Sequence, residues 1–351
     1  MRARDLGLFA DEPTGPHNAI TDVAGVRVGH VTLISDEPAV VRTGVTAIVP
    51  REDVFHRKVT AAVHVINGYG KATGLVQIEE TGYIETPIVL TNTLCVGRAV
   101  DGLIGYMLEE VPGIGEELGT VNPVVAECND GYLNQARYRA VEPGHVAEAV
   151  RRARSGPVEE GSVGAGTGMT SFRFKSGIGT ASRKLGEHTL GVLVLANFGR
   201  RRDLTIAGVP VGRELDEGRD RADDGSAVVI LATDAPCEFR LLGRVARRAV
   251  AGLVRTGSAL AHGSGDFVIA FSTRAPRPLD EAGELVEGLF RAAAAATEEA
   301  VLNSLLAARD MTGYRGRTVP ALPLQETVRL LEKYGRGQGG PQDFWSPAGD
   351  A

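Results

Sequence analysis

Apolar and polar positions alternate in short runs along the first two thirds of the chain, and glycine-rich turns separate these runs. Runs that are rich in β-branched residues and bounded by turn residues are typical of strands. The pattern predicts strands within the ranges 18–33, 43–50, 87–97, 123–138, 188–199 and 203–215. Two stretches, 98–110 and 145–156, have helical periodicity instead.

The last third of the chain contains longer elements. Two apolar runs, 226–234 and 265–273, have no polar face, and each lies next to a long stretch with a wide apolar stripe at helical spacing, 238–257 and 278–308. Strands that are apolar on both faces are buried on both faces, and helices cover such sheets economically. We therefore expect a layered α/β protein.

Two segments have no such pattern. The stretch 213–224 is charged and aperiodic, so we expect an exposed linker there, and the tail 335–351 is expected to be frayed. With 351 residues the chain can form one large α/β unit or two packed lobes.

Composition excludes several classes of partner. The formal net charge of -6 provides no basic surface for nucleic acid. No apolar run is long enough to span a membrane, and the first residues lack the apolar core of a signal peptide. Because Cys95, Cys128 and Cys237 are too few and too scattered for a disulfide framework, we expect a reducing compartment and place the protein in the cytoplasm.

Several familiar chemistries lack their motifs. The seven histidines show no HExxH spacing and none pairs with a cysteine, so no metal is expected. The stretch 164–168 (GAGTG) is followed by a glycine-broken alternating segment and not by a helix, which favours a glycine-rich hairpin over a dinucleotide site. No GxSxG motif is present, because the spacing around Ser264 does not fit, and this weakens the case for a Ser-His-Asp triad.

Gly225 and Ser226 stand between the charged linker and a buried strand, where self-cleavage would leave a new amino terminus on a rigid element. The Ser226 hydroxyl could attack the Gly225 carbonyl, and a glycine permits the contorted peptide geometry that this attack needs. The freed amine, with an ordinary pKa of about 7.7–8.0, suits a general base for its own hydroxyl. On the residues alone, the pair can equally be a simple joint between loop and strand.

Six motifs follow one another along the chain: RARDLG, GPHNAITDVAGVRVGH, SGIGTASR, ANFGRRRDLTIAGVPVG, ATDAP and SGDFVIAFST. Together they resemble a known family, the DmpA-like enzymes, which are the L-aminopeptidase/D-esterase and β-aminopeptidase proteins of the P1 peptidase family. The resemblance implies a four-layer αββα sandwich similar in layout to N-terminal-nucleophile hydrolases. It also implies a single catalytic domain, 1–351, that cleaves itself into an α subunit, 1–225, and a β subunit, 226–351.

The resemblance also assigns roles to particular residues. It implies that Ser226 is the nucleophile and that Ser264 and Asp266 hold and tune its amine and hydroxyl. Some relatives have glutamate where this chain has Asp266. Asn197 matches a donor to the oxyanion, Tyr132 matches a pocket tyrosine, and Glu127 or Asp130 is the expected counter-charge for the substrate ammonium.

The expected reaction is the cofactor-free removal of an N-terminal residue from small peptides, amides or esters that carry a free amine, through an acyl-enzyme on Ser226. The family further implies a homotetramer of αβ heterodimers. Two alternatives stay open: an acyltransferase of the ornithine-acetyltransferase type, whose nucleophile is threonine, and a non-catalytic assembly protein with the same fold. The serine at 226 argues against the first, and the intact Gly225–Ser226 pair argues against the second.

Overall fold

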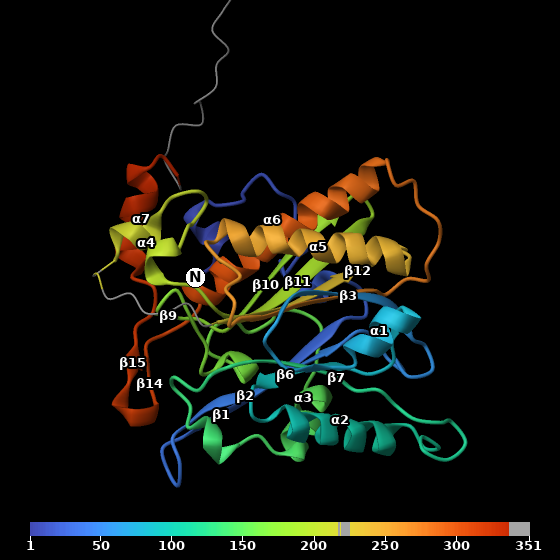
Figure 1. Cartoon of the computed structure of the whole chain (residues 1–351). Helices are drawn as coiled ribbons and strands as arrows, with labels where there is room; N and C mark the ends of the chain where they lie inside the picture. The colour runs from blue at the N-terminus through green and yellow to red at the C-terminus, as the bar shows by residue number, and fades with distance from the viewer. Residues whose placement is uncertain (217, 219–224, 337–351) are drawn as a thin grey trace, which may run out of the picture.

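The computed structural model describes residues 1–216, 218 and 225–336. It contains two large stacked sheets with helices on both outer faces (Figure 1). The first sheet has the strand order β1-β2-β6-β7-β4 and consists of β1 (Arg27–Ser35), β2 (Val41–Val49), β6 (Ile88–Asn92), β7 (Val124–Cys128) and β4 (Ala72–Thr73). The second sheet has the order β10-β11-β12-β13-β3-β5 and consists of β10 (Ile178–Leu185), β11 (His188–Asn197), β12 (Ser226–Thr233), β13 (Gly265–Ser272), β3 (Val59–Gly68) and β5 (Tyr83–Ile84).

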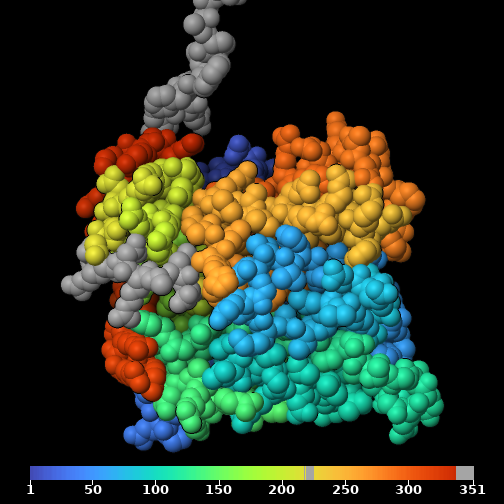
Figure 2. Space-filling model, in the orientation of Figure 1, coloured from blue at the N-terminus to red at the C-terminus, as the bar shows by residue number. Residues whose placement is uncertain are grey.

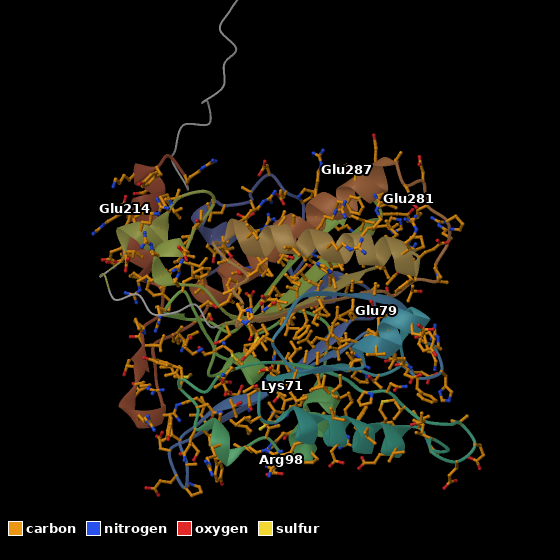
Figure 3. All side chains as sticks on the ribbon, in the orientation of Figure 1. Lys71, Glu79, Arg98, Glu214, Glu281 and Glu287 are labelled. Carbon is orange, nitrogen blue, oxygen red and sulfur yellow. The ribbon has the colours of Figure 1, made fainter. Side chains whose placement is uncertain are left out.

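The helices form the outer layers. On the second sheet lie α5 (Phe239–Arg255) and α6 (Glu284–Leu306), and on the first sheet lie α2 (Val96–Glu110) and α3 (Pro143–Arg151) (Figure 1). Arg98 of α2 and Glu287 of α6 mark these opposite layers in Figure 3. The shorter helices are α1 (Leu75–Thr81), α4 (Val211–Glu214) and α7 (Leu324–Lys333). The predicted four-layer αββα sandwich is therefore confirmed.

Strand β12 shows why its sequence is a solid apolar run. Val229 and Leu231 pack into the core under α5 and α6, whereas Val228 and Ile230 pack into the core between the two sheets. Successive side chains of a strand point to opposite faces, so a strand between two cores must be apolar at every position. The central strand β11 follows the same rule.

Helix α6 lies very close to the second sheet because the residues at their contact are small. A Cβ atom added to Gly179 in β10 would stand 1.8 Å from the carbonyl oxygen of Ala300. The same helix contributes a buried carboxylate, Glu299, whose Oε1 accepts bonds from Arg4 Nε at 3.0 Å and Asn18 Nδ2 at 2.6 Å. Its Oε2 lies 2.7 Å from Arg183 Nη1. Glu299 therefore ties the amino-terminal segment and β10 to α6.

The second sheet combines strands from both sides of residue 225. Strands β12 and β13 lie in its middle, between β11 and β3. In Figure 2 the amber layer after residue 238 lies directly against the blue and cyan segment that includes β3 and α1. The two parts of the chain thus share one sheet and its core.

One predicted strand is absent from the structure, and the predicted glycine-rich hairpin lies a few residues later in the chain than expected. Residues 203–215 were predicted as a strand, but they form a turn and α4, with only one isolated bridge, Ile206 to Val209. Ala207 and Gly208 both have positive φ, 49° and 82°, and Pro210 lacks the N–H that a central strand donates. The glycine-rich stretch forms a buried 3₁₀ turn, Gly164–Gly166, and the hairpin follows it as β8 (Thr170–Ser171) and β9 (Phe174–Lys175).

The elements that the sequence patterns missed include β3, β10, α1 and α7. A further small hairpin joins β14 (Met311–Thr312) to β15 (Thr318–Val319). The expected linker, 213–224, begins inside α4, which includes Arg213 and Glu214. Residues 217 and 219–224 of this linker, and 337–351 of the expected frayed tail 335–351, lie outside the described residues. None of the helices in the described ranges has both the length and the apolar character needed to cross a membrane.

Candidate active site

Three neighbouring strand ends bring the predicted nucleophile and two of its predicted partners together. Ser226 is the first residue of β12 and is paired with Asn197, the last residue of β11, on one side and with Gly265 on the other. Asp266 follows at the start of β13, opposite Ala227. The Ser226 residue is only 7% exposed, so the sheet holds it in a fixed position.

Gly225 has no room for a side chain. A Cβ atom at this position would stand 2.6 Å from the Cα of Phe198 and 2.8 Å from the carbonyl oxygen of Asn197. Because separations under about 3 Å do not occur for real Cβ atoms, only glycine fits here without a shift of the backbone. The residue before the predicted cleavage point is thus packed directly against the end of β11.

Ser264 and Asp266 form a hydrogen-bonded pair. The Ser264 Oγ donates to Asp266 Oδ1 at 2.7 Å, and the same oxygen accepts the backbone N–H of Ala227 at 2.9 Å. Both side chains are almost completely buried. The carboxylate of Asp266 is therefore fixed one residue from Ser226.

Asn67 at the end of β3 holds the loop that carries Ser264, a role that sequence reasoning missed. Its Nδ2 donates to the carbonyl oxygens of His262 at 2.9 Å and Ser264 at 2.5 Å. The pairing of β13 with β3 shifts by one residue between Asp266 and Phe267. Such a bulge commonly re-aims side chains next to a functional site.

The Asn197 side chain is held by two hydrogen bonds that fix which way its amide faces. Its Oδ1 accepts the N–H of Thr170 at 3.0 Å, and its Nδ2 donates to the Asn129 carbonyl at 3.0 Å. An amide nitrogen carries two N–H groups, so Nδ2 has a second donor available for a ligand next to Ser226. This arrangement suits a preorganised donor to a developing oxyanion.

A cavity of about 1120 Å³ opens onto these residues. Five of the residues singled out from the sequence line it, namely Glu127, Tyr132, Asn197, Gly225 and Ser226. The buried Ser264, Asp266 and Asp130 do not line it. A ligand in this cavity can therefore touch Ser226 and Asn197 directly but meets Asp266 only through other groups.

The two candidate counter-charges differ in access. Glu127 is the next-to-last residue of β7 and lines the cavity. Its Oε1 accepts the backbone N–H of Lys71 at 3.0 Å and lies 3.5 Å from the Lys71 ammonium, whereas its buried Oε2 has no hydrogen-bond partner in the described part of the chain. Asp130 is fully buried and its Oδ1 accepts a bond from Asn134 at 2.9 Å. Burial raises the pKa of Asp130 to about 7, against the lowering effect of hydrogen bonds from Thr43 and Asn134. The geometry thus favours Glu127 as the group that meets a substrate ammonium.

Tyr132 is 38% exposed and lies under the guanidinium of Arg317, whose Cζ is 4.7 Å from the ring centroid.

Sequence reasoning did not single out the cationic residues on the cavity wall, which are Lys71, Arg173, Arg200 and Arg201. The sequence held a signal for Arg200 and Arg201, because three consecutive arginines follow Asn197 within five residues. Within the described residues no three His, Cys, Asp or Glu side chains gather as a metal site would require.

Comparison with known proteins places these features in context. The model of peptidase family S58 matches residues 18–319. The β-peptidyl aminopeptidase BapA of Sphingosinicella microcystinivorans is 43% identical over 95% of this chain and 93% of its own length.

Solved structures agree with this match. The crystal structure of the PH0078 protein from Pyrococcus horikoshii OT3 is 49% identical, with a TM-score of 0.90 over 96% of this chain and 100% of that one. The L-aminopeptidase D-Ala-esterase/amidase of Ochrobactrum anthropi, described as a prototype for the serine aminopeptidases and a variant of the Ntn hydrolase fold, is 40% identical. Its TM-score is 0.86 over 95% of this chain and 99% of its own.

Proposed function

The chain belongs to peptidase family S58 and is an aminopeptidase, and from this premise we propose that it cuts itself between Gly225 and Ser226 and uses the new amino-terminal serine as its nucleophile. The observation that carries this proposal is the position of Ser226 between Asn197 and Gly265, at the ends of three adjacent strands. The cut would give an α subunit, 1–225, and a β subunit, 226–351, of one catalytic domain.

Self-cleavage proceeds through an ester. The Ser226 Oγ attacks the carbonyl carbon of Gly225, the C–N bond of the peptide breaks, and the nitrogen of Ser226 takes up the hydroxyl proton. Water then hydrolyses the ester, which leaves a carboxylate on Gly225 and a free amine on Ser226. The absence of a side chain at Gly225 supports this step, because the attack needs a backbone geometry that side chains oppose.

In turnover the Ser226 amine acts as the base for its own hydroxyl. Its ordinary pKa of about 7.7–8.0 suits proton transfer near neutrality. The oxygen attacks the scissile carbonyl, Asn197 donates to the oxyanion, and the amine passes the proton to the leaving nitrogen. Water then releases the acyl group from Ser226. The Ser264–Asp266 pair, fixed through Ala227, positions the amine.

Substrates are small peptides, amides or esters with a free amine. Glu127 is the counter-charge for the substrate ammonium, because its buried Oε2 faces no partner in the described residues and the residue lines the cavity. Tyr132 lines the same wall. No cofactor is needed, since nucleophile, base and oxyanion donor all come from the chain. The relatives are named as a β-peptidyl aminopeptidase and as an L-aminopeptidase D-Ala-esterase/amidase. The acyl groups to be assayed are therefore L-α-, D-α- and β-amino acids.

The decisive experiment is the intact mass of the purified protein with N-terminal sequencing, beside Ser226→Ala. We expect two fragments from the wild type, the smaller beginning Ser-Ala-Val-Val-Ile, and one uncut chain from the variant. The wild type should hydrolyse amino-acid p-nitroanilides and the variant should not. A wild-type chain that stays whole and inert after long incubation would contradict the proposal.

We also propose a homotetramer of αβ heterodimers in the cytoplasm. The three cysteines, Cys95, Cys128 and Cys237, are buried free thiols, which supports a reducing compartment. Light scattering of the processed protein tests the assembly, and a mass other than four αβ pairs contradicts it.

A further inference from the structure

We infer that the cavity recognises a free carboxylate on the leaving-group side of its substrate through Arg173 and Arg201, so that the preferred substrates are short zwitterionic peptides. This inference rests on the proposed function, which places bond cleavage at Ser226 and the ammonium at Glu127. It specifies the substrate class of that site.

The charges on the cavity wall are divided between two groups of elements. Glu127 and Lys71 come from β7 and from the residue before β4, both at the first sheet. Lys71 is labelled in Figure 3 and lies between the upper helical layer and α2.

The other charged wall residues come from the turn between β8 and β9, from the segment that follows β11, and from the segment after α4. They are Arg173, Arg200, Arg201 and Asp216. Arg200 is paired with Asp203, with Nε 2.9 Å from Oδ2, so among the described wall residues the guanidinium groups of Arg173 and Arg201 remain on this side beside the one carboxylate of Asp216. A substrate with an ammonium at one end and a carboxylate at the other matches this division of charge.

Arg173 is presented to the cavity by a strained turn. Phe172 and Arg173 join β8 to β9, and both have positive φ, 52° and 63°. Turns of this kind favour Asn and Gly, and other residues adopt the left-handed region at a cost. Phe172 is held there by an edge-on contact of its ring with Phe198, at 5.3 Å between centroids, and by its N–H bond to the Phe198 carbonyl at 2.9 Å. The packing of Phe172 therefore dictates the turn, and Arg173 occupies its open side.

Both guanidinium groups have donors available. The Arg173 side chain makes no hydrogen bond or ion pair with the described residues. Arg201 stacks on Phe174, with Cζ 4.5 Å from the ring centroid, and donates from Nη2 to the Arg173 carbonyl at 3.3 Å. Its buried Nε has no partner in the described part of the molecule. A guanidinium presents its donors in a planar fork that matches a carboxylate.

The same hairpin contacts the oxyanion donor. Thr170, at the start of β8, donates its N–H to Asn197 Oδ1 at 3.0 Å. Arg173 is three residues further along the chain. A carboxylate that binds at Arg173 therefore engages a hairpin that is hydrogen-bonded to the catalytic amide.

The test compares β-alanyl-L-alanine and L-alanyl-L-alanine, each as the free acid and as the C-terminal amide. For the acyl group that the enzyme accepts, we expect kcat/KM to favour the acid by about tenfold or more, the effect of one charge-assisted hydrogen bond. In Arg173→Asn this acid-to-amide ratio should fall about tenfold. The unfolding temperature should not fall, because asparagine tolerates the left-handed turn better than arginine. Arg201→Gln should lower the ratio as well.

The matched control is Arg202→Gln, which removes the adjacent exposed arginine that does not line the cavity, and its ratio should equal that of the wild type. A wild-type ratio near one, or a ratio unchanged in both Arg173→Asn and Arg201→Gln, overturns this inference and leaves the proposed function standing. A chain that neither cuts itself nor hydrolyses any of the four compounds overturns both.

Discussion

The Oγ of Ser264 and the backbone N–H of Ala227 both donate to one oxygen of Asp266, at 2.7 and 2.9 Å. This shared acceptor connects the loop before β13 with the residue that follows Ser226. A carboxylate held from two directions keeps its position when the peptide bond before Ser226 is broken. The amine formed there would meet a charge that is already oriented.

Removing that charge should slow the reaction. We expect Asp266→Asn to lower kcat by about 10²-fold, the lower range for a group that assists proton transfer, while the fold persists because Asn can still accept both bonds. Steady-state kinetics on a p-nitroanilide measures the effect. Asp266→Glu, which keeps the charge on a longer arm, should retain more activity than Asp266→Asn. Equal activity of Asp266→Asn and the wild type would refute the positioning role.

The side chain of Asn197 should act mainly in the transition state. Asn197→Ala is expected to lower kcat by about 10²–10³-fold with little change in KM, because an oxyanion donor contributes most when charge develops. Asn197→Asp, which has the same shape without the N–H donors, should be impaired similarly. A variant with normal kcat and raised KM would show that Asn197 binds substrate in its ground state instead.

Glu127 should act through substrate binding. Glu127→Gln is expected to lower kcat/KM by about 10–100-fold, the effect of losing a charge-assisted bond of about 1.5–3 kcal/mol. Asp130→Asn, at a buried position off the cavity, should lose far less activity. If Asp130→Asn has the lower kcat/KM of the two variants, Glu127 is not the counter-charge for the substrate ammonium.

Asp130 should instead make stability depend on pH. Its folded pKa of about 7 exceeds the ordinary 3.8, so between these values the folded state binds more protons than the unfolded state. The free energy of unfolding therefore falls as pH rises from about 4 to 7, by up to about 4 kcal/mol for this group. Asp130→Asn should be more stable than the wild type at pH 8, and the difference should disappear near pH 4. Urea titrations at both pH values measure it, and a constant difference would disprove the linkage.

The buried carboxylate of Glu299 should be a major source of stability. Glu299→Ala removes the partner of the buried Arg183 and of Arg4 and Asn18, and we expect a loss of about 3–5 kcal/mol in the free energy of unfolding. The control is Glu287→Ala on the same helix, whose exposed pair with Arg291 is worth about 0.3–0.5 kcal/mol. Comparable losses from the two variants in chemical denaturation would rule out this role of Glu299.

The sequence predicted best where burial dictates composition. A strand was expected within 188–199 and another over 226–234, and the structure has β11 at His188–Asn197 and β12 at Ser226–Thr233, because strands between two cores are apolar at every position. Strand β3 escaped detection because its outer part is only half-buried and its apolar pattern is broken.

Residues that act through distant partners could not be predicted in this way. Asn67 holds a loop almost 200 positions away along the chain. Arg173 occupies a turn that its residue type disfavours, so local propensity argues against the conformation that the packing of Phe172 imposes.

The placement of β12 and β13 between β11 and β3 has a consequence for how the molecule comes apart. If the backbone is cut before Ser226, strands of both pieces still form one sheet. The two pieces can dissociate only if the hydrogen bonds of β12 to β11 and of β13 to β3 all break. Unfolding then produces two molecules from one, so the midpoint of denaturation should rise with protein concentration. In the uncut Ser226→Ala chain the same sheet would melt at a midpoint independent of concentration, apart from any effect of higher assembly.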